Sequence, residues 1–481
     1  MIDDKSNSDT DETLGHKVWS ALQKYRLDSE NRQSTALLQQ KAQFLVDEMG
    51  LENWIRKGGL NLENLSKFLD PYLRHSNHLH HPGFIGHQVA VPHVGASIAD
   101  MIHGVINNPM AVYEMGPTAA VIERVIVNWM LEKIGWFSGA NLTDFTDNAD
   151  HGGGVLTHGG SLANLTALLA ARAAHFPDSW ENGVPDNLGV IVPTASHYSM
   201  ARAISISGMG AQASCHAPVD ELNVLRPEKL QQTFDQATDQ GREVFMVVAN
   251  ACATATGLYD PIDEIADFCE SNNLWLHIDG AHGASALLSK NRRGLLKGIA
   301  RADSVIWDAH KMLRTSALCA GVLFRQQKHL AQTFSQEEDY IAFGNTEYGF
   351  DAGTFTVECT KAHLGTKLFW VLAMEGEQGL SDFVEKQYFD TKEFYNLINS
   401  EPDFECPYEP QSNILCFRYL PFPHEQQVEL RKKVLEHGNF YITSASIGKK
   451  SYLRLAVMNP LTTMQTIKNL LDEIRTCAKL L

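Results

Sequence analysis

The segment YDPIDEIADFCESNNLWLHID, residues 259–279, combines the two patterns that indicate the fold class. Its first part, 261–272, has the apolar spacing of an amphipathic helix, and LWLHID at 274–279 is a nearly continuous apolar strand. Similar runs alternate on either side: strand-like GVIVPT (189–194), VFMVVAN (244–250) and DSVIWD (303–308), and helical stretches at 197–209, 227–240 and 291–300. This alternation predicts an α/β fold with a mostly parallel sheet that helices cover on both faces.

The flanking regions have different patterns. Helical apolar spacing runs from 17 to 73, and PTAAVIERVIVNWMLEKIG (117–135) is an amphipathic helix that begins at a proline. Beyond Thr360 a long helical pattern leads to two strand-like runs, NILCFRYL (413–420) and SYLRLAV (451–457), with helices at 425–436 and 463–478. We therefore expect an N-terminal helical segment over 1–80, a large domain over 81–365 and a small α+β domain over 366–481.

Bulk properties exclude several classes of function. The chain has 481 residues and a formal net charge of -17, and no run of Lys or Arg forms the basic stripe that binds nucleic acid. The eight cysteines include no CxxC pair and suit a reducing compartment. No stretch of 18 apolar residues and no secretory signal is visible, so we expect a cytoplasmic protein without a membrane partner.

Two charged residues follow apolar strands. Lys311 lies just past DSVIWD, and Asp279 ends LWLHID. A lysine there is usually solvated, and an aspartate there commonly caps the next helix. However, open α/β sheets bind ligands at the carboxyl ends of their strands, where a desolvated lysine can attack an aldehyde. A carboxylate at the same edge could keep a pyridine nitrogen protonated.

Two weaker signals precede them in the chain. Gly159, Gly160 and Ser161 open a long helix, and the N-terminus of a helix is an anion site, although a simple turn and cap have the same residues. His197 follows a strand and opens a helix, where it could be a cap or could stack on a cofactor ring. The order of the four signals fits one cofactor, pyridoxal 5'-phosphate (PLP), better than any other.

At these residues the chain resembles the group II PLP-dependent decarboxylases, and it is most similar to glutamate and cysteine sulfinate decarboxylases. The similarity covers about 81–460, in the blocks HPGF (81–84), YEMGP (113–117), HGGSLAN (158–164), HYS (197–199), the segment 259–279, HKM (310–312) and YLRLAVMNP (452–460). The resemblance implies fold type I of the PLP-dependent transferases, with a seven-stranded sheet in a large PLP-binding domain. It also implies a homodimer with the active site at the interface.

The resemblance implies a role for each matching residue. Lys311 would hold the cofactor covalently, Asp279 would pair with its ring nitrogen, and His197 would stack on the ring. The other expected cofactor contacts are Ala281 at the ring, Gly160, Ser161 and His310 at the phosphate, and Asn250 where the family commonly has Thr. Arg454 would bind the substrate α-carboxylate. Tyr340, or else Tyr348, would return a proton to Cα of the product. Asp308, where the family usually has Asn, and His282, where it has an aromatic residue, depart from the pattern.

The substrate is predicted from the segment after HPGF. His87 and Gln88 fall where family members contact the substrate side chain, and polar donors there suit a carboxylate or sulfinate. We therefore expect α-decarboxylation of glutamate, aspartate or cysteine sulfinate. The alternatives are a basic or aromatic substrate such as 2,4-diaminobutyrate or tyrosine, an aldehyde-forming reaction, and a catalytically silent PLP-fold binding protein. The histidine-rich run RHSNHLHHPGF (74–84) is interpreted as a loop, so no metal is predicted.

Overall fold

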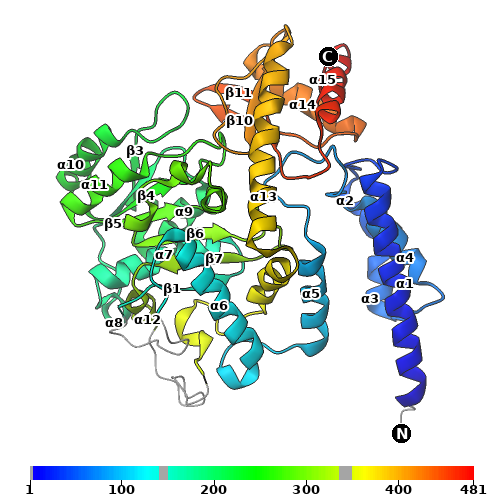
Figure 1. Cartoon of the computed structure of the whole chain (residues 1–481), viewed down its shortest axis with the longest axis horizontal. Coiled ribbons are helices and arrows are strands. Elements are labelled where there is room, and N and C mark those ends of the chain that lie inside the picture. The colour runs from blue at the N-terminus through cyan, green and yellow to red at the C-terminus, as the bar shows by residue number, and fades with distance from the viewer. Residues whose placement is uncertain (1–3, 140–149, 335–348) are drawn as a thin grey trace.

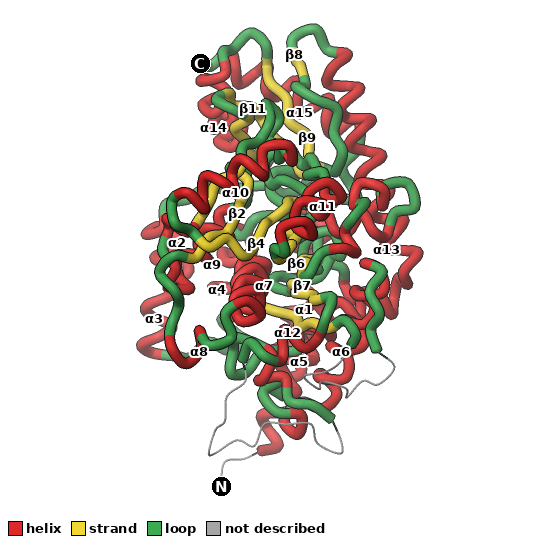
Figure 2. Tube along the Cα trace, turned by 90° about the vertical axis from the view of Figure 1, so that its left-hand side faces the viewer, coloured by secondary structure: helices red, strands yellow, loops and turns green. Residues whose placement is uncertain are grey.

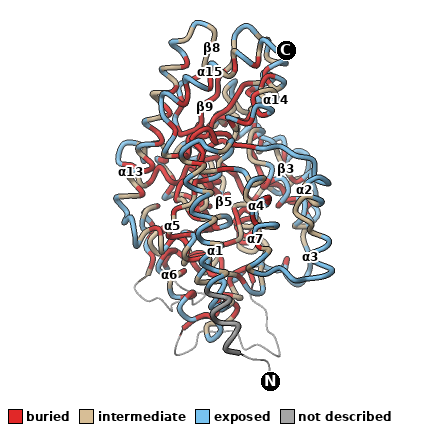
Figure 3. The backbone as a smooth tube through the Cα atoms, turned by 90° about the vertical axis from the view of Figure 1, so that its right-hand side faces the viewer, coloured by how far each residue is buried: buried red, intermediate tan, exposed pale blue. Residues whose placement is uncertain are grey.

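The computed structural model describes residues 4–139, 150–334 and 349–481, in three successive parts (Figure 1). The first part is helical, and its longest helix extends along one side of the molecule. Its helices are α1 (Asp4–Glu30), α2 (Ala42–Met49), α3 (Leu51–Lys57) and α4 (Leu65–His75). Figure 3 shows that α3 and the part of α1 from Thr13 onward are mostly exposed.

The second part is built on a seven-stranded sheet of order β1-β7-β6-β5-β4-β2-β3. The neighbours from β3 to β6 are parallel, whereas β7 is antiparallel to both β6 and β1. The strands are β1 (Gly153–Thr157), β2 (Leu188–Pro193), β3 (Ser214–Ala217), β4 (Glu243–Asn250), β5 (Trp275–Asp279), β6 (Ser304–Asp308) and β7 (Ala320–Phe324). The predicted α/β fold with a mostly parallel sheet is confirmed.

Both faces of this sheet are buried, because successive residues of each strand belong to different cores. In β4, Val247 packs in one core and Val248 in the other, and Val305 and Ile306 of β6 divide in the same way. Figure 2 shows the strands enclosed among helices. These helices are α5 (Val94–Ile106), α6 (Pro117–Ile134), α7 (Gly160–His175), α8 (Ser179–Asn182), α9 (Tyr198–Ile204), α10 (Leu230–Asp239), α11 (Ile262–Asn272) and α12 (Gln327–Ala331).

The third part begins with α13 (Leu364–Ser400), which bends at Gly376, where φ is 67°. It continues into a four-stranded antiparallel sheet of order β10-β11-β9-β8 with two helices. These elements are β8 (Phe404–Glu405), β9 (Ile414–Tyr419), α14 (Gln427–His437), β10 (Thr443–Ile447), β11 (Lys450–Ala456) and α15 (Met464–Ala478). They enclose a core of their own around Leu415, Phe417 and Leu453.

One predicted helix is wrong. Residues 291–300 form two short 3₁₀ turns, Arg293–Leu296 and Ile299–Arg301, instead of an α-helix. Gly298 between them has a φ of 92°, and a Cβ there would lie 2.7 Å from the backbone of Asp263. Close packing against α11 therefore turns the chain at this glycine. None of the helices in the described ranges combines the length and hydropathy needed to cross a lipid bilayer.

Candidate active site

A cavity of about 390 Å³ lies where β5 and β6 end and α7 begins. This volume is within the range of about 300–1,000 Å³ typical of small-molecule sites. Seven of the predicted site residues line it: Gly160, Ser161, His197, Asp279, Ala281, His310 and Lys311. The structure thus brings together predicted residues that are up to 151 positions apart in the sequence.

Lys311 is held at the cavity by the turn that follows β6. Its Nζ lies 3.2 Å from Oδ2 of Asp308, and Nε2 of His310 lies 3.6 Å from the same oxygen. Asp308 is buried, and its Oδ1 has no hydrogen-bond partner in the described part of the chain. The unexpected carboxylate therefore has a cation beside it, which offsets its charge next to the predicted phosphate site.

The start of α7 is packed against this carboxylate. A Cβ at Gly160 would lie 2.9 Å from both oxygens of Asp308, so only glycine fits at this contact. Ser161 follows it and is exposed. The first N–H groups of a helix have no partner within the helix and attract anions. The N-terminus of α7 can therefore bind a phosphate group beside Lys311.

The carboxylate of Asp279 is held by the buried side-chain amide of Asn164. Nδ2 of Asn164 donates to Oδ2 of Asp279 at 3.0 Å and to Oγ of Ser199 at 2.9 Å. The Ser199 hydroxyl lies 2.8 Å from Nδ1 of His197. Burial lowers the pKa of His197, and the charge of Asp279 partly opposes this shift. Asn164 and Ser199 were not predicted, although Asn164 lies one helical turn after Gly160 and so shares its face.

Other unpredicted residues also line the cavity. Nε2 of His282 donates to Oδ1 of Asn413 at 2.6 Å, and burial lowers the pKa of His282 to about 3. Burial raises the pKa of the Cys252 thiol to about 11, so it is neutral at pH 7. Nδ1 of His158 lies 2.5 Å from Oε1 of Glu358, which places this hydrogen-bonded pair at the cavity wall.

Arg454 lies behind the cavity wall and does not line it. It is buried, and its guanidinium donates to five acceptors: the carbonyls of Ala255 (3.2 Å), Gly86 (3.2 Å) and Thr254 (2.7 Å), Oγ1 of Thr443 (3.3 Å) and Oε1 of Gln88 (2.9 Å). A guanidinium has five N–H groups, so all of them are engaged. Thr254, whose carbonyl accepts from Arg454, lines the cavity, so only this one residue separates Arg454 from the cavity.

Three remaining predictions have different outcomes. His87 is exposed near Arg454 and does not line the cavity. Asn250 does not line it either, because its amide accepts from Ser196 at 2.9 Å and donates to Asp260 at 3.0 Å. Tyr340 and its alternative Tyr348 lie outside the described residues.

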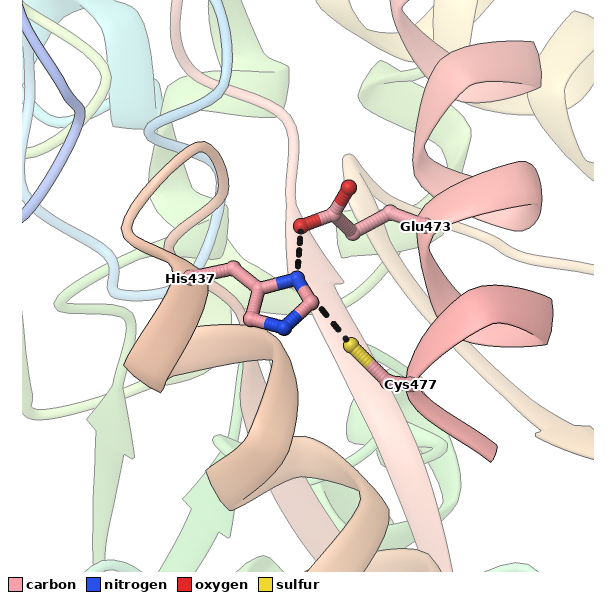
Figure 4. Close-up of side chains that lie close together, drawn as sticks. All are labelled: His437, Glu473 and Cys477. Carbon is pink, nitrogen blue, oxygen red and sulfur yellow. Dashed lines mark hydrogen bonds and ion pairs between the residues drawn. The ribbon is translucent and has the colours of Figure 1, made fainter. Parts of the chain in front are cut away.

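A second cluster of reactive side chains lies in the C-terminal part. Figure 4 shows His437, at the end of α14, facing Glu473 and Cys477 of α15. Nδ1 of His437 lies 2.9 Å from Oε1 of Glu473 and 3.6 Å from Sγ of Cys477. A carboxylate only accepts hydrogen bonds, so this Nδ1 carries the proton that it donates to Glu473, beside a buried thiol.

The family is shown by comparison with known proteins. Residues 61–420 match the family described as the pyridoxal-dependent decarboxylase conserved domain. The chain therefore belongs to this family of PLP-dependent amino-acid decarboxylases, and PLP is its cofactor. The residues fit that cofactor, because an amine, a carboxylate on the neighbouring strand and a glycine-lined helix N-terminus face one cavity.

Individual relatives are more distant. The acidic amino acid decarboxylase GADL1 of Mus musculus is 29% identical over 441 residues, which cover 87% of this chain and 78% of that protein. Cysteine sulfinic acid decarboxylase of Rattus norvegicus is 28% identical, over 77% of this chain and 76% of that protein. A crystal structure of mouse CSAD superposes with a TM-score of 0.87 at 25% identity, over 97% of this chain and 98% of that one.

Proposed function

We propose that the protein catalyses α-decarboxylation of an acidic L-amino acid: glutamate, aspartate or cysteine sulfinate. The observation that carries the proposal is that Lys311 and Asp279, at the ends of the neighbouring strands β6 and β5, line one cavity. Two similar proteins at 28–29% identity are named for acidic substrates. Support for decarboxylation comes from the family, and support for an acidic substrate comes from these relatives and from the charges near the cavity.

Each residue has a distinct task in this reaction. The bound cofactor supplies an electron sink for the bond that breaks at Cα. Lys311 would hold the cofactor covalently, Asp279 would keep its ring nitrogen protonated, and His197 would stack on its ring. The helix start at Gly160 and Ser161, together with His310, binds the phosphate. Tyr340 remains our candidate for returning a proton to Cα.

In this proposal Arg454 binds the α-carboxylate of the substrate. Since its five N–H groups are already engaged, an incoming carboxylate takes the place of one acceptor. Oε1 of Gln88 is the acceptor that exchanges, because three of the others are backbone carbonyls and the fourth, Oγ1 of Thr443, is held in place by its own hydrogen bond to the carbonyl of Gly86. Nε2 of Gln88 is buried without a partner in the described residues and gains one by donating to the carboxylate.

The charge around His87 favours an acidic side chain. Partial desolvation of its ring lowers the pKa of His87 most, although the residue as a whole is exposed, and the charges of Arg454 and Arg431 lower it further. Two guanidinium groups therefore make the potential around His87 positive, close to the cavity although His87 itself does not line it. A carboxylate or sulfinate is attracted by that potential, and a second ammonium group is repelled.

An amino-acid panel assayed for carbon dioxide release tests this function. PLP-loaded protein is supplied with glutamate, aspartate, cysteine sulfinate, 2,4-diaminobutyrate and tyrosine, and the product is analysed as amine or aldehyde. We expect amine and carbon dioxide from an acidic substrate, and no turnover by Lys311→Ala. Preference for tyrosine or 2,4-diaminobutyrate contradicts the substrate, an aldehyde product contradicts the reaction, and no turnover with any amino acid favours a binding protein.

We also propose that the protein is a homodimer. An apolar groove of about 200 Å³ lies between α1 and the start of α5, lined by Trp19, Leu22 and Val94 among others. Further along α5, Val105 is 84% exposed. Exposed apolar surfaces of this kind mark contact sites, and a second copy of the chain is the partner that the family resemblance implies.

Sedimentation measures this assembly directly. The dimer predicts twice the chain mass for the wild type and a shift towards monomer for Trp19→Glu combined with Leu22→Glu. Trp180→Glu on α8, also an exposed apolar residue, is the control and leaves the mass unchanged. A wild-type monomer at micromolar concentration contradicts the proposal.

A further inference from the structure

A chain of buried hydrogen bonds runs beneath the cavity floor from Trp275 to Asp279. Nε1 of Trp275 donates to Oγ of Ser304 at 2.8 Å, and that oxygen lies 2.8 Å from Nδ1 of His277. Nε2 of His277 lies 2.9 Å from Oδ1 of Asn164, whose Nδ2 donates to Asp279 at 3.0 Å. All five residues are buried, and three elements, β5, β6 and α7, contribute to the chain.

The direction of these bonds is fixed from the Asp279 end. A carboxylate only accepts, so the amide nitrogen of Asn164 must face it and the amide oxygen must face His277. Nε2 of His277 therefore carries a proton. Because burial lowers the pKa of His277 to about 4, the ring is neutral at pH 7 and its Nδ1 is an acceptor.

The Trp275 end is compatible with the same direction. An indole N–H can only donate, so it occupies a lone pair of Ser304 and leaves the hydroxyl proton free to donate onward. The acceptor of that proton is Nδ1 of His277. The two ends therefore agree on a single arrangement, in which every bond points from Trp275 towards Asp279.

A branch of the same network reaches His197. The second proton of the Asn164 amide is donated to Ser199, so the Ser199 hydroxyl donates to Nδ1 of His197. The backbone N–H of Ser199 also donates to this Nδ1, at 3.3 Å. When His197 is neutral its proton therefore lies on Nε2.

We propose that Trp275, Ser304, His277 and Asn164 form a positioning relay that orients the carboxylate of Asp279 and places the proton of His197 on Nε2. The inference rests on the proposed placement of the cofactor ring nitrogen at Asp279. None of the first three residues lines the cavity, so they act through Asn164. A carboxylate held by an amide keeps one orientation towards a ring nitrogen, which preserves the pairing.

The chain contains a matched control for this relay. Ser304 and Ser285 are both fully buried serines that accept from an indole N–H, from Trp275 at 2.8 Å and from Trp307 at 2.9 Å. Only Ser304 continues to a histidine. Ser304→Ala and Ser285→Ala each leave one buried indole N–H unpaired, so their direct effects on unfolding are comparable.

The experiment measures PLP affinity of apo-protein by fluorescence titration, and the pH at which the visible band of the holoenzyme changes. We expect Ser304→Ala to weaken PLP binding about tenfold and to shift that pH, and Asn164→Ala to weaken binding more, because it removes a bond to a charged group. Ser285→Ala should leave both quantities at wild-type values. Thermal unfolding of each variant separates a loss of folding from a loss of positioning.

Equal PLP affinity and equal band titration in Ser304→Ala and Ser285→Ala would overturn the relay. The outcome is independent of the substrate assignment, because neither measurement uses an amino acid. A failed amino-acid panel therefore removes the proposed substrate or reaction and leaves the relay standing, whereas matched serine variants remove the relay alone.

Discussion

At the scale of the residue, Asp308 is the side chain whose chemistry is least expected. It is a buried carboxylate that contacts the glycine at the start of α7 and lies 3.2 Å from Nζ of Lys311. A phosphate bound at that helix start adds a second negative charge nearby. Like charges in a poorly solvated site repel each other, so Asp308 opposes cofactor binding, the more so once Lys311 is joined to the cofactor.

Asp308→Asn should therefore bind PLP about tenfold more tightly than the wild type, because it removes this repulsion and keeps the shape of the side chain. The affinity is measured by titration of apo-protein. Asp303→Asn is the control, since Asp303 precedes β6 at its other end and pairs with Arg325 at 2.7 Å. Weaker binding by Asp308→Asn would mean that this carboxylate assists the phosphate by carrying a proton.

At the scale of the element, apolar runs predicted the central strands well and the short glycine-containing strands poorly. Runs such as VFMVVAN have a clear pattern because both faces of the sheet are buried. By contrast, β1 is GGVLT, and a Cβ at Gly154 would lie 2.5 Å from the carbonyl of Val322. Its glycines are required by the neighbouring strand, and a requirement of this kind has no local sequence signal.

The same distinction applies to the site. Lys311 and Asp279 were predicted because each follows an apolar strand, and ligands bind where such strands end. Ser304 and Trp275 stand at the opposite ends of the same strands and have no pattern of their own. Their contribution depends on the register of β5 against β6, which pairs His277 with Ser304 and which the sequence alone does not reveal.

At the scale of the whole molecule, buried histidines determine how stability depends on pH. Burial lowers the pKa of five histidines well below 6.5: to about 3 for His282 and about 4 for His80, His81, His277 and His329. Above pH 6.5 these rings are neutral in the folded and in the unfolded chain, so their burial costs no protonation energy. As pH falls from 6.5 towards 4, the unfolded chain binds protons that the folded chain does not, and the free energy of unfolding decreases. Asp260, whose pKa burial raises to about 6, acts in the opposite direction.

We therefore expect the free energy of unfolding to fall as pH decreases from 6.5 to 4.5, by up to about 1.4 kcal/mol per pH unit for each histidine. Urea unfolding at several pH values measures this slope. His329→Gln, which lies away from the active-site cavity, should reduce the slope by one histidine's share. A free energy that stays constant over this pH range would contradict the assignment of these rings as neutral.

The fully engaged guanidinium of Arg454 has a consequence for which molecules the enzyme rejects. A ligand that displaces the amide oxygen of Gln88 gains binding free energy only from the difference between its own hydrogen bond to Arg454 and the bond that it replaces. An ester or primary amide of the amino acid offers another neutral carbonyl, so it gains less from the exchange than an anion does. An anion replaces a neutral acceptor by a charged one and gains from every exchange. If Arg454 binds the substrate as proposed, amino acids whose α-carboxylate is blocked should therefore bind less tightly than the free amino acid.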